Sequence, residues 1–120
     1  MQKTILIVDD SHLVIKLVSF RLQKEGYHVL TGTDGKEALG CFNGNDIDLV
    51  ITDLNMPNMD GLSLIKEIRK TSKYQYTPVV LFITPDPEDK KHMYTSGATA
   101  LLVKDEINQK LSSTVKKMIP

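Results

Sequence analysis

Five polar or charged side chains stand at the ends of largely apolar segments that are typical of buried strands: Asp9, Asp10, Asp53, Asn55 and Lys104. The segments are 5–8, 49–52 and 100–103. A single acid after a strand is more often a turn or helix-capping residue than part of a site. Several carboxylates near one another, however, are costly to bury unless a cation or a hydrogen-bonded partner neutralises them. Together, these residues favour a site for metal-assisted phosphoryl transfer.

The adjacent acids Asp9 and Asp10 begin the first strand-to-helix loop, where phosphate-binding proteins usually carry glycines or hydroxyl groups. Carboxylates in this loop repel phosphate unless a metal intervenes. A few hard oxygen ligands with room for water suit Mg²⁺, which also bridges to phosphoryl groups. The pair therefore indicates a metal first and a phosphate second. The alternative, in which Asp10 caps the next helix and Asp9 is solvated, stays open.

The composition fits one compact domain over residues 1–120, long enough to bury a core without disulfides. Lys plus Arg equals Asp plus Glu at 15 each, so bulk charge recruits neither nucleic acid nor an anionic membrane. Cys41 is the only cysteine, which excludes an intramolecular disulfide and a cysteine-rich zinc site. With no signal-peptide core and no membrane-spanning apolar run, we expect a cytoplasmic protein.

Strand and helix candidates alternate five times along the chain, which predicts a domain of βαβ units. The predicted strands cover about 3–8, 27–31, 47–52, 78–84 and 99–103. The second resembles an edge strand, whereas the continuous apolar run of the fourth predicts a central strand covered on both faces. Right-handed crossovers place helices on both faces of a parallel sheet and all strand-to-helix loops at one edge, where ligands bind.

The helices are predicted from apolar spacing. The first, about 11–25, carries Leu13, Leu17 and Phe20 at helical spacing before Gly26 ends it. The third and the fifth helix each place apolar side chains on one face: Leu64, Ile65 and Ile68, then Ile107, Leu111, Val115 and Ile119.

Two helices have recognisable N-terminal caps. Asp34 and Glu37 predict a capping box for the second helix, which should end near 43–45. Asp86 is the expected N-cap of the fourth helix, followed by a proline, with Asp89 reaching back to the cap. Because the segment 88–94 has only Met93 as a clearly apolar residue, we expect this fourth helix to fray.

Longer motifs connect these residues. They are Ile-Leu-Ile-Val-Asp9-Asp10-Ser11, Asp53-Leu-Asn-Met-Pro57-Asn-Met-Asp60-Gly61, a strand-ending Thr84, Ser-Gly97-Ala, and Lys104 after the fifth strand. On these motifs the chain resembles, over its whole length, the receiver domains of two-component response regulators, most closely the stand-alone chemotaxis type. The resemblance implies a flavodoxin-like, doubly wound (βα)5 fold with strand order 2-1-3-4-5.

The resemblance also implies roles for the acidic residues. In this family, the residue that matches Asp53 accepts a phosphoryl group from a kinase phosphohistidine. Asp10 and Asp53 would bind Mg²⁺ directly, Asp9 through water, and Asn55 through its backbone carbonyl. A carboxylate is a poor nucleophile toward an anionic phosphoryl group unless charge is neutralised, so a metal fits this chemistry.

Two further residues and the partners follow from the same resemblance. Lys104 would contact the phosphoryl group, and the Thr84 hydroxyl would turn inward to bond it. The donor would be a sensor histidine kinase or a phosphotransfer protein. A downstream protein target would recognise the face formed by the fourth helix, the fifth strand and the fifth helix. Beyond its own phosphorylation and dephosphorylation, we expect no substrate turnover, no direct nucleic acid binding and no membrane insertion.

Three positions depart from the family pattern. Leu101 stands where many members carry a Tyr or Phe that switches rotamer together with the residue matching Thr84. Asp105 replaces a proline whose preceding peptide bond is usually cis; a cis bond before Asp would cost roughly 3 to 4 kcal/mol, so we expect a trans bond. Pro85 lacks the backbone N–H that the family directs at the phosphoryl oxygens.

Two other functions remain as alternatives. The departures at 85, 101 and 105 are compatible with a receiver-like interaction module that signals without phosphorylation. A small-molecule enzyme fits less well. A phosphatase with an aspartyl nucleophile usually has a second Asp where this chain has Asn55. A flavin protein requires a hydroxyl- and glycine-rich first loop where this chain has Asp9 and Asp10.

Overall fold

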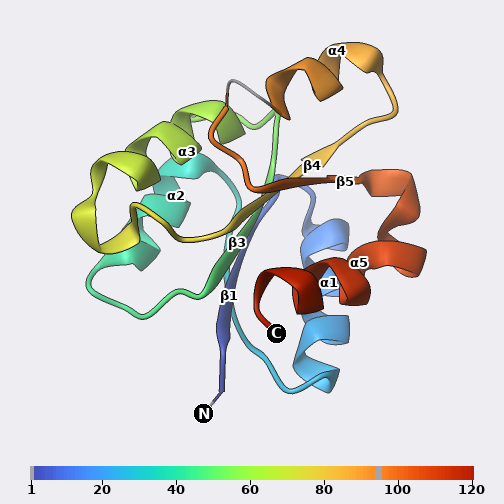
Figure 1. The fold of residues 1–120 in the computed structure, drawn as a ribbon, viewed down its shortest axis with the longest axis horizontal. Coiled ribbons are helices and arrows are strands. Elements are labelled where there is room, and N and C mark those ends of the chain that lie inside the picture. The colour runs from blue at the N-terminus through green and yellow to red at the C-terminus, as the bar shows by residue number, and fades with distance from the viewer. Residues whose placement is uncertain (1, 94–95) are drawn as a thin grey trace.

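The computed structural model describes residues 2–93 and 96–120 and contains a five-stranded parallel sheet in the order β2-β1-β3-β4-β5 (Figure 1). The strands are β1 (Thr4–Val8), β2 (His28–Gly32), β3 (Leu49–Asp53), β4 (Val79–Ile83) and β5 (Ala100–Val103). The α-helices are α1 (His12–Lys24), α2 (Gly35–Leu39), α3 (Gly61–Lys70), α4 (Pro87–Lys90) and α5 (Ile107–Met118). Short 3-10 turns cover Gly40–Phe42, Ser72–Tyr74, Lys91–Met93 and Lys104–Glu106. The predicted fold and strand order are confirmed.

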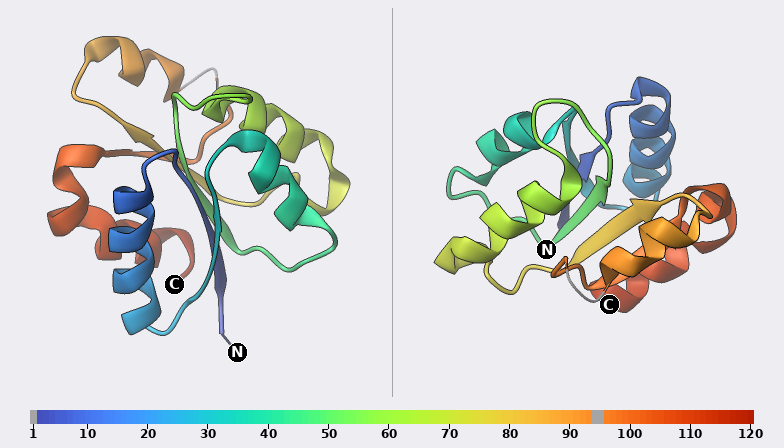
Figure 2. Two further views of the ribbon diagram at one scale, coloured as in Figure 1. Left: turned by 180° about the vertical axis from the view of Figure 1, so that it is seen from behind. Right: turned by 90° about the horizontal axis from the view of Figure 1, so that it is seen from above.

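Alternation of side chains along the strands divides the core into two layers. Ile5 and Ile7 of β1 point to the face covered by α1 and α5, whereas Leu6 and Val8 point to the face covered by α2 and α3. The two views of Figure 2 show these helix pairs on opposite sides of the sheet. All residues of β3 and β4 are buried, which explains the continuous apolar run of the fourth predicted strand. β4 is an inner strand, and β2 lies at one edge of the sheet as predicted.

Helix α1 faces the sheet with a different stripe from the one noted in the sequence. Val18 and Leu22 are fully buried, whereas Leu13, Leu17 and Phe20 are exposed at 77%, 44% and 59%. The helix is apolar on both sides, so two stripes have helical spacing, and only the docking of the helix decides which one is buried. In α3 and α5 the polar face is unambiguous, and the predicted residues of α3 and the first three of α5 are buried.

Helices α2 and α4 are short, and Asp34 and Asp86 are their N-caps as predicted, but the acid at the third helical position of each does not bond back to the cap. The Asp34 side chain accepts a hydrogen bond from the backbone N–H of Glu37 at 2.8 Å, as expected for a capping box. The Glu37 carboxylate, however, accepts from the N–H and the hydroxyl of Thr33, the residue before the cap. Helix α4 has one four-residue turn, and none of Pro87–Lys90 is buried, in line with the weak helix expected here. The expectation for this segment extended to Tyr94, which lies outside the described residues.

Two strand boundaries differ from the prediction in a way that affects the site. β3 begins two residues later than expected and includes Asp53, while β4 ends one residue before Thr84. Asp53 is therefore held by the hydrogen-bonded ladder, in register with Phe82 of β4. Thr84, by contrast, belongs to the loop between β4 and α4. In the described ranges, no helix is both long enough and apolar enough to cross a membrane.

The N-terminus of α3 packs directly against the end of β3. The backbone N–H of Gly61 donates to the carbonyl of Leu54 at 2.9 Å. A Cβ atom added to Gly61 would overlap the carbonyl oxygen of Asp53. Asp60 caps the helix by accepting from the N–H of Ser63 at 2.8 Å. The absence of a side chain at position 61 thus allows the helix to lie against the backbone of Asp53.

We expect Gly61→Ala to reduce the free energy of unfolding by about 1 to 3 kcal/mol, because the new methyl group forces α3 away from β3. Urea unfolding of the two proteins measures the difference. Gly40→Ala is the matched control: a Cβ at this helical position meets no atom within 4 Å. It should be neutral or stabilise by up to about 1 kcal/mol. Equal effects of the two substitutions would contradict the close approach.

Candidate functional site

Three carboxylates converge at the carboxyl edge of the sheet. Asp9 and Asp10 follow β1, and Asp53 ends β3, the strand beside it. One oxygen of each carboxylate lies within 4.8 Å of the others. Asp9 is fully buried, Asp53 is 8% exposed, and Asp10 is exposed. The edge therefore combines buried negative charge with one face open to solvent.

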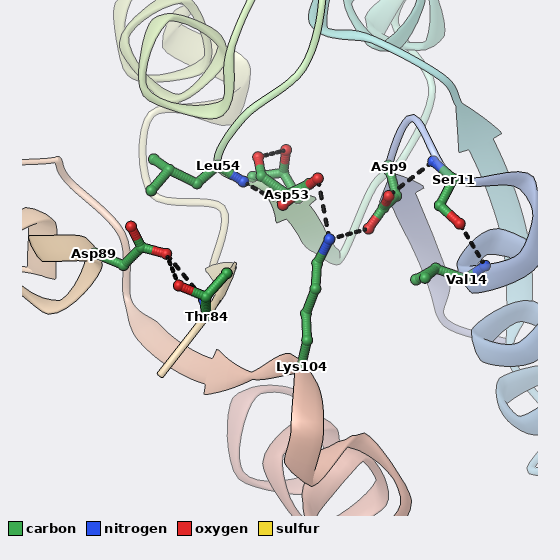
Figure 3. A network of polar contacts seen from close by, with 9 residues as sticks. Asp9, Ser11, Val14, Asp53, Leu54, Thr84, Asp89 and Lys104 are labelled. Atoms are coloured by element: carbon green, nitrogen blue, oxygen red, sulfur yellow. Dashed lines mark hydrogen bonds and ion pairs between the residues drawn. The ribbon is translucent and has the colours of Figure 1, made fainter. Parts of the chain in front are cut away.

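Lys104 connects two of these carboxylates. Its Nζ lies 3.1 Å from Asp53 Oδ2 and 3.3 Å from Asp9 Oδ2. Figure 3 draws the lysine between the two carboxylates. The lysine follows β5, two strands away from β3, so only the completed sheet brings these groups together. The Lys104 to Asp105 peptide bond is trans, as predicted, and the side chain still reaches both acids. An ammonium group between two carboxylates offsets part of their repulsion.

Lys104 offsets only part of the cost of ionising Asp53 in the fold. Burial raises the pKa of Asp53, and the negative charge of Asp9 raises it further, while Lys104 and the backbone N–H of Leu54 act in the opposite direction. Burial alone would lower the pKa of Lys104, but its close contacts with the negative charges of Asp53 and Asp9 raise it overall. The ionised Asp53 thus remains less favourable in the fold than in water.

The loop between β1 and α1 shows that Asp10 is not the N-cap of α1 and that Asp9 is not solvated. Ser11, not Asp10, is the N-cap of α1, and its Oγ accepts from the N–H of Val14 at 3.3 Å. Asp9 is buried instead of solvated, and its Oδ1 accepts from the N–H of Ser11 at 2.9 Å. The alternative interpretation of the acidic pair, in which Asp10 caps the helix and Asp9 is solvated, is therefore wrong.

The donor set fits a divalent cation. Asp9 Oδ2 is buried and accepts no hydrogen bond within the described part of the chain, with the ammonium group of Lys104 as its ion-pair partner. Asp10 and Asp53 add further carboxylate oxygens, and Asp10 is open to solvent. Hard oxygen ligands with access to water are the set that Mg²⁺ prefers. The oxygen donors of the three acids therefore fit a divalent cation such as Mg²⁺.

Two other positions singled out in the sequence, Asn55 and Leu101, lie in the loop after β3 and in β5. Asn55 is exposed in the loop after β3, and its carbonyl as a metal ligand stays a prediction. Leu101 pairs with Leu81 in the sheet and packs against the core layer under α2 and α3. Position 101 therefore contributes an aliphatic contact, and it has no ring to exchange places with Thr84.

Thr84 has a partner that sequence reasoning missed. Its hydroxyl donates to Asp89 Oδ2 at 2.7 Å, and its backbone N–H donates to the same oxygen at 2.9 Å. Asp89 was expected to reach back to the cap residue Asp86, but it reaches past Asp86 to Thr84. The N–H of Asp86 instead donates to Thr84 Oγ1 at 3.3 Å. The sequence did contain a signal for this contact. Before α2, Thr33 likewise follows a strand and precedes the acidic cap Asp34.

Known proteins resemble this chain closely. Residues 5–116 match the family described as the response regulator receiver domain. The chain is 37% identical to the chemotaxis response regulator CheY4 of Vibrio cholerae, with a TM-score of 0.91, covering 99% of this chain and 100% of that one. It is 35% identical to the response regulator TrrA of Thermotoga maritima, solved in complex with Mg²⁺-BeF, with a TM-score of 0.86, covering 98% and 100% of the two chains.

A longer curated relative also resembles this chain. The alkaline phosphatase synthesis transcriptional regulatory protein PhoP of Bacillus subtilis is 31% identical over 120 residues, which are 99% of this chain and 49% of that protein. The chain thus spans about half the length of this curated relative.

The raised pKa of Asp53 predicts how stability depends on pH. Below the ordinary aspartate range, Asp53 is neutral in both the folded and the unfolded state and imposes no penalty. As the pH rises through the unfolded and then the folded pKa, the unfolded state releases its proton more readily, and folding is penalised. Asp53→Asn removes this penalty, so in a metal chelator the variant should be more stable than wild type at neutral pH.

Urea unfolding between neutral pH and about pH 3 tests this expectation, and the advantage of the variant should disappear toward the acidic end. Asp46→Asn serves as the charge-matched control, because the Asp46 side chain is 93% exposed. An Asp53→Asn protein less stable than wild type at every pH would show that Lys104 overcompensates the buried charge.

Proposed function

We propose, because this chain belongs to the family of response regulator receiver domains, that Asp53 is its phosphoacceptor and that residues 1–120 act as one receiver domain. Members of this family are signalling modules of two-component systems and not enzymes that turn over a separate substrate. They bind Mg²⁺ in an acidic pocket and interact with histidine kinases or phosphotransfer proteins. The observation that carries the proposal is the placement of Lys104 Nζ between Asp53 and Asp9.

The chemistry required of Asp53 explains the surrounding charges. One carboxylate oxygen of Asp53 forms a bond to phosphorus while the bond from phosphorus to the donor imidazole breaks, and the imidazole nitrogen retains that electron pair. Two anions must approach each other in this step, so positive charge has to be in position beforehand. Lys104 supplies one such charge at the carboxylate. Its ammonium group can hold a phosphoryl oxygen as the negative charge shifts onto the product.

The metal would be held by the carboxylates of Asp10 and Asp53, by Asp9 through water and by the backbone carbonyl of Asn55. Bound Mg²⁺ supplies additional positive charge at the phosphoryl oxygens. Asp9 Oδ1 accepts from the N–H of Ser11, and Asp9 Oδ2, which is paired with Lys104, would orient a ligand water. Asp53 is fixed by the N–H of Leu54 at 2.8 Å. The protein thus contributes mainly positioning, which in phosphoryl transfer is a large part of catalysis.

The output would pass through Thr84 and the face formed by α4, β5 and α5. Thr84 lies between β4 and α4, and its hydroxyl is the group that would bond the phosphoryl oxygens. None of Pro87–Lys90 is buried, so few contacts fix α4 and a modest free energy can shift its position. Movement of Thr84 would thereby change the surface offered to a downstream protein target.

Intact mass spectrometry after incubation with a small acyl phosphate tests this function directly. We expect a gain of one phosphoryl group in the presence of Mg²⁺, and none with chelator or in Asp53→Asn. Asp46→Asn, which removes an exposed acid, should be labelled like the wild type. Absence of labelling in the wild type, despite Mg²⁺ binding, would contradict the proposal.

The second candidate is a receiver-like interaction module that does not use phosphorylation. Three observations favour it: the commitment of Thr84 to Asp89, the lack of an N–H at Pro85 and the aliphatic Leu101. In that case, a target would bind the wild type and Asp53→Asn with equal affinity. The labelling experiment therefore separates the two candidates.

Pro85 has no backbone N–H to donate at the position where phosphoryl oxygens would lie, and this predicts slow phosphorylation. A charge-assisted hydrogen bond contributes roughly 1.5 to 3 kcal/mol. Water can take over part of this role, so the lower end applies. Pro85→Ala should therefore raise the rate of Asp53 labelling by about tenfold or somewhat less. Initial rates of phosphorylation by the acyl phosphate, followed by mass, provide the measurement.

The control for this prediction is Pro87→Ala. Pro87 is the first residue of α4, so its replacement alters the same segment without creating an N–H at position 85. The Pro87→Ala protein should be labelled at the wild-type rate. Equal acceleration by the two substitutions would assign the effect to loosening of the loop and not to a new donor.

A further inference from the structure

The loop between β4 and α4 leaves no free donor next to the proposed phosphoryl position. The Thr84 N–H and hydroxyl both donate to Asp89 Oδ2. Pro85 has no N–H, and the N–H of Asp86 donates to the Thr84 hydroxyl oxygen. The donors of Thr84 are therefore committed to Asp89, and the N–H of Asp86 is committed to Thr84.

The hydroxyl proton of Thr84 is the decisive group. A hydroxyl has one proton to donate, so a bond to Asp89 and a bond to a phosphoryl oxygen exclude each other. In Figure 3, Asp89 and Asp53 lie on opposite sides of Thr84, and the dashed lines from Thr84 run to Asp89. The 2.7 Å length is typical of a strong bond to a carboxylate. The same bonds lower the pKa of Asp89, which keeps it ionised as an acceptor at neutral pH.

We propose that Asp89 is a positioning residue that competes with the phosphoryl group for the Thr84 hydroxyl and thereby holds the unphosphorylated state. This inference rests on the proposed function and adds its regulation. Phosphorylation then has to break the contacts between Thr84 and Asp89 before Thr84 can turn to Asp53. Because Asp89 lies in α4, their loss also removes a bond that fixes the first turn of that helix.

Coupling of this kind acts in both directions. A ligand that captures Thr84 destabilises the contact with Asp89, and removal of Asp89 strengthens binding of that ligand by the same free energy. If the hydroxyl is free in only a fraction of molecules, the apparent dissociation constant rises by the inverse of that fraction. A single hydrogen bond of ordinary strength corresponds to about a two- to tenfold effect.

Helix α2 provides an internal control. Thr33 follows β2 and donates its N–H and hydroxyl to Glu37, the third residue of α2, in the same way as Thr84 does to Asp89 of α4. Both acids belong to caps of short helices after strands of one sheet. Only Thr84 has a proposed role in binding the phosphoryl group, so loss of Glu37 tests the effect of a broken cap alone.

The experiment measures the affinity of beryllofluoride in the presence of Mg²⁺ by isothermal titration calorimetry. Asp89→Ala should bind the probe about two- to tenfold more tightly than the wild type, whereas Glu37→Ala should bind like the wild type. Asp89→Asn retains an acceptor oxygen but loses the charge, so it should give a smaller gain. Urea unfolding of all variants confirms that the comparison is made on folded protein.

A double-mutant cycle separates capture of the hydroxyl from a general effect of charge or stability. In a Thr84→Ala background, Asp89→Ala should no longer tighten binding. An equal gain in that background, an equal gain in Glu37→Ala, or unchanged affinity in Asp89→Ala would each overturn the role of Asp89. If the wild type binds no beryllofluoride and is not labelled at Asp53, the proposed function fails and this inference fails with it.

Discussion

The arrangement at the carboxyl edge of the sheet depends on one constraint, the negative charge concentrated there. Asp9 is fully buried and Asp53 nearly so, and neither would be stable as an isolated anion in such surroundings. One ammonium group, from Lys104, lies within 3.3 Å of an oxygen of each. One positive charge opposite the three carboxylates leaves an excess of negative charge, and this excess is what makes the edge receptive to a cation. The fold thus keeps an unfavourable interaction between like charges at this edge of the sheet.

The surrounding structure keeps these charges in place with backbone contacts. Asp53 belongs to the ladder of β3, and α3 begins directly against its carbonyl because position 61 carries no side chain. Asp9 is held by the N–H of Ser11, the residue that also caps α1. Since the two acids are fixed by strands and caps, they lose little freedom when a ligand binds. Preorganisation of this kind favours phosphoryl transfer, in which positioning matters more than acid or base chemistry.

The loop after β4 is held by fewer contacts than the acidic cluster. Thr84 is exposed, α4 is a single turn with no buried residue, and the contacts to Asp89 are local and reversible. Their free energy is small compared with that of the core layers on the two faces of the sheet. An acidic cluster fixed by strands and caps therefore lies near a segment that few contacts hold in place. A similar contact between Thr33 and Glu37 at the start of α2 shows that this arrangement also forms away from the acidic cluster.

The amino-acid sequence alone determined the alternation of strands and helices, the parallel sheet, and the edge at which Asp9, Asp10, Asp53 and Lys104 meet. These features follow from local patterns: apolar runs, caps and a motif of fixed spacing. The resemblance to receiver domains added the strand order, which local patterns do not contain. The buried stripe of α1, the capping of that helix by Ser11 and the reach of Asp89 to Thr84 were decided only in the tertiary structure. In each of these cases the sequence offers two arrangements: two apolar stripes on α1, two candidate caps for the N-terminus of α1, or two donors for the Asp89 carboxylate. For α1, packing against the sheet selects the buried stripe, and that contact exists only after the chain has folded. The other two contacts are local, and they depend on the backbone conformation of the loops that follow β1 and β4.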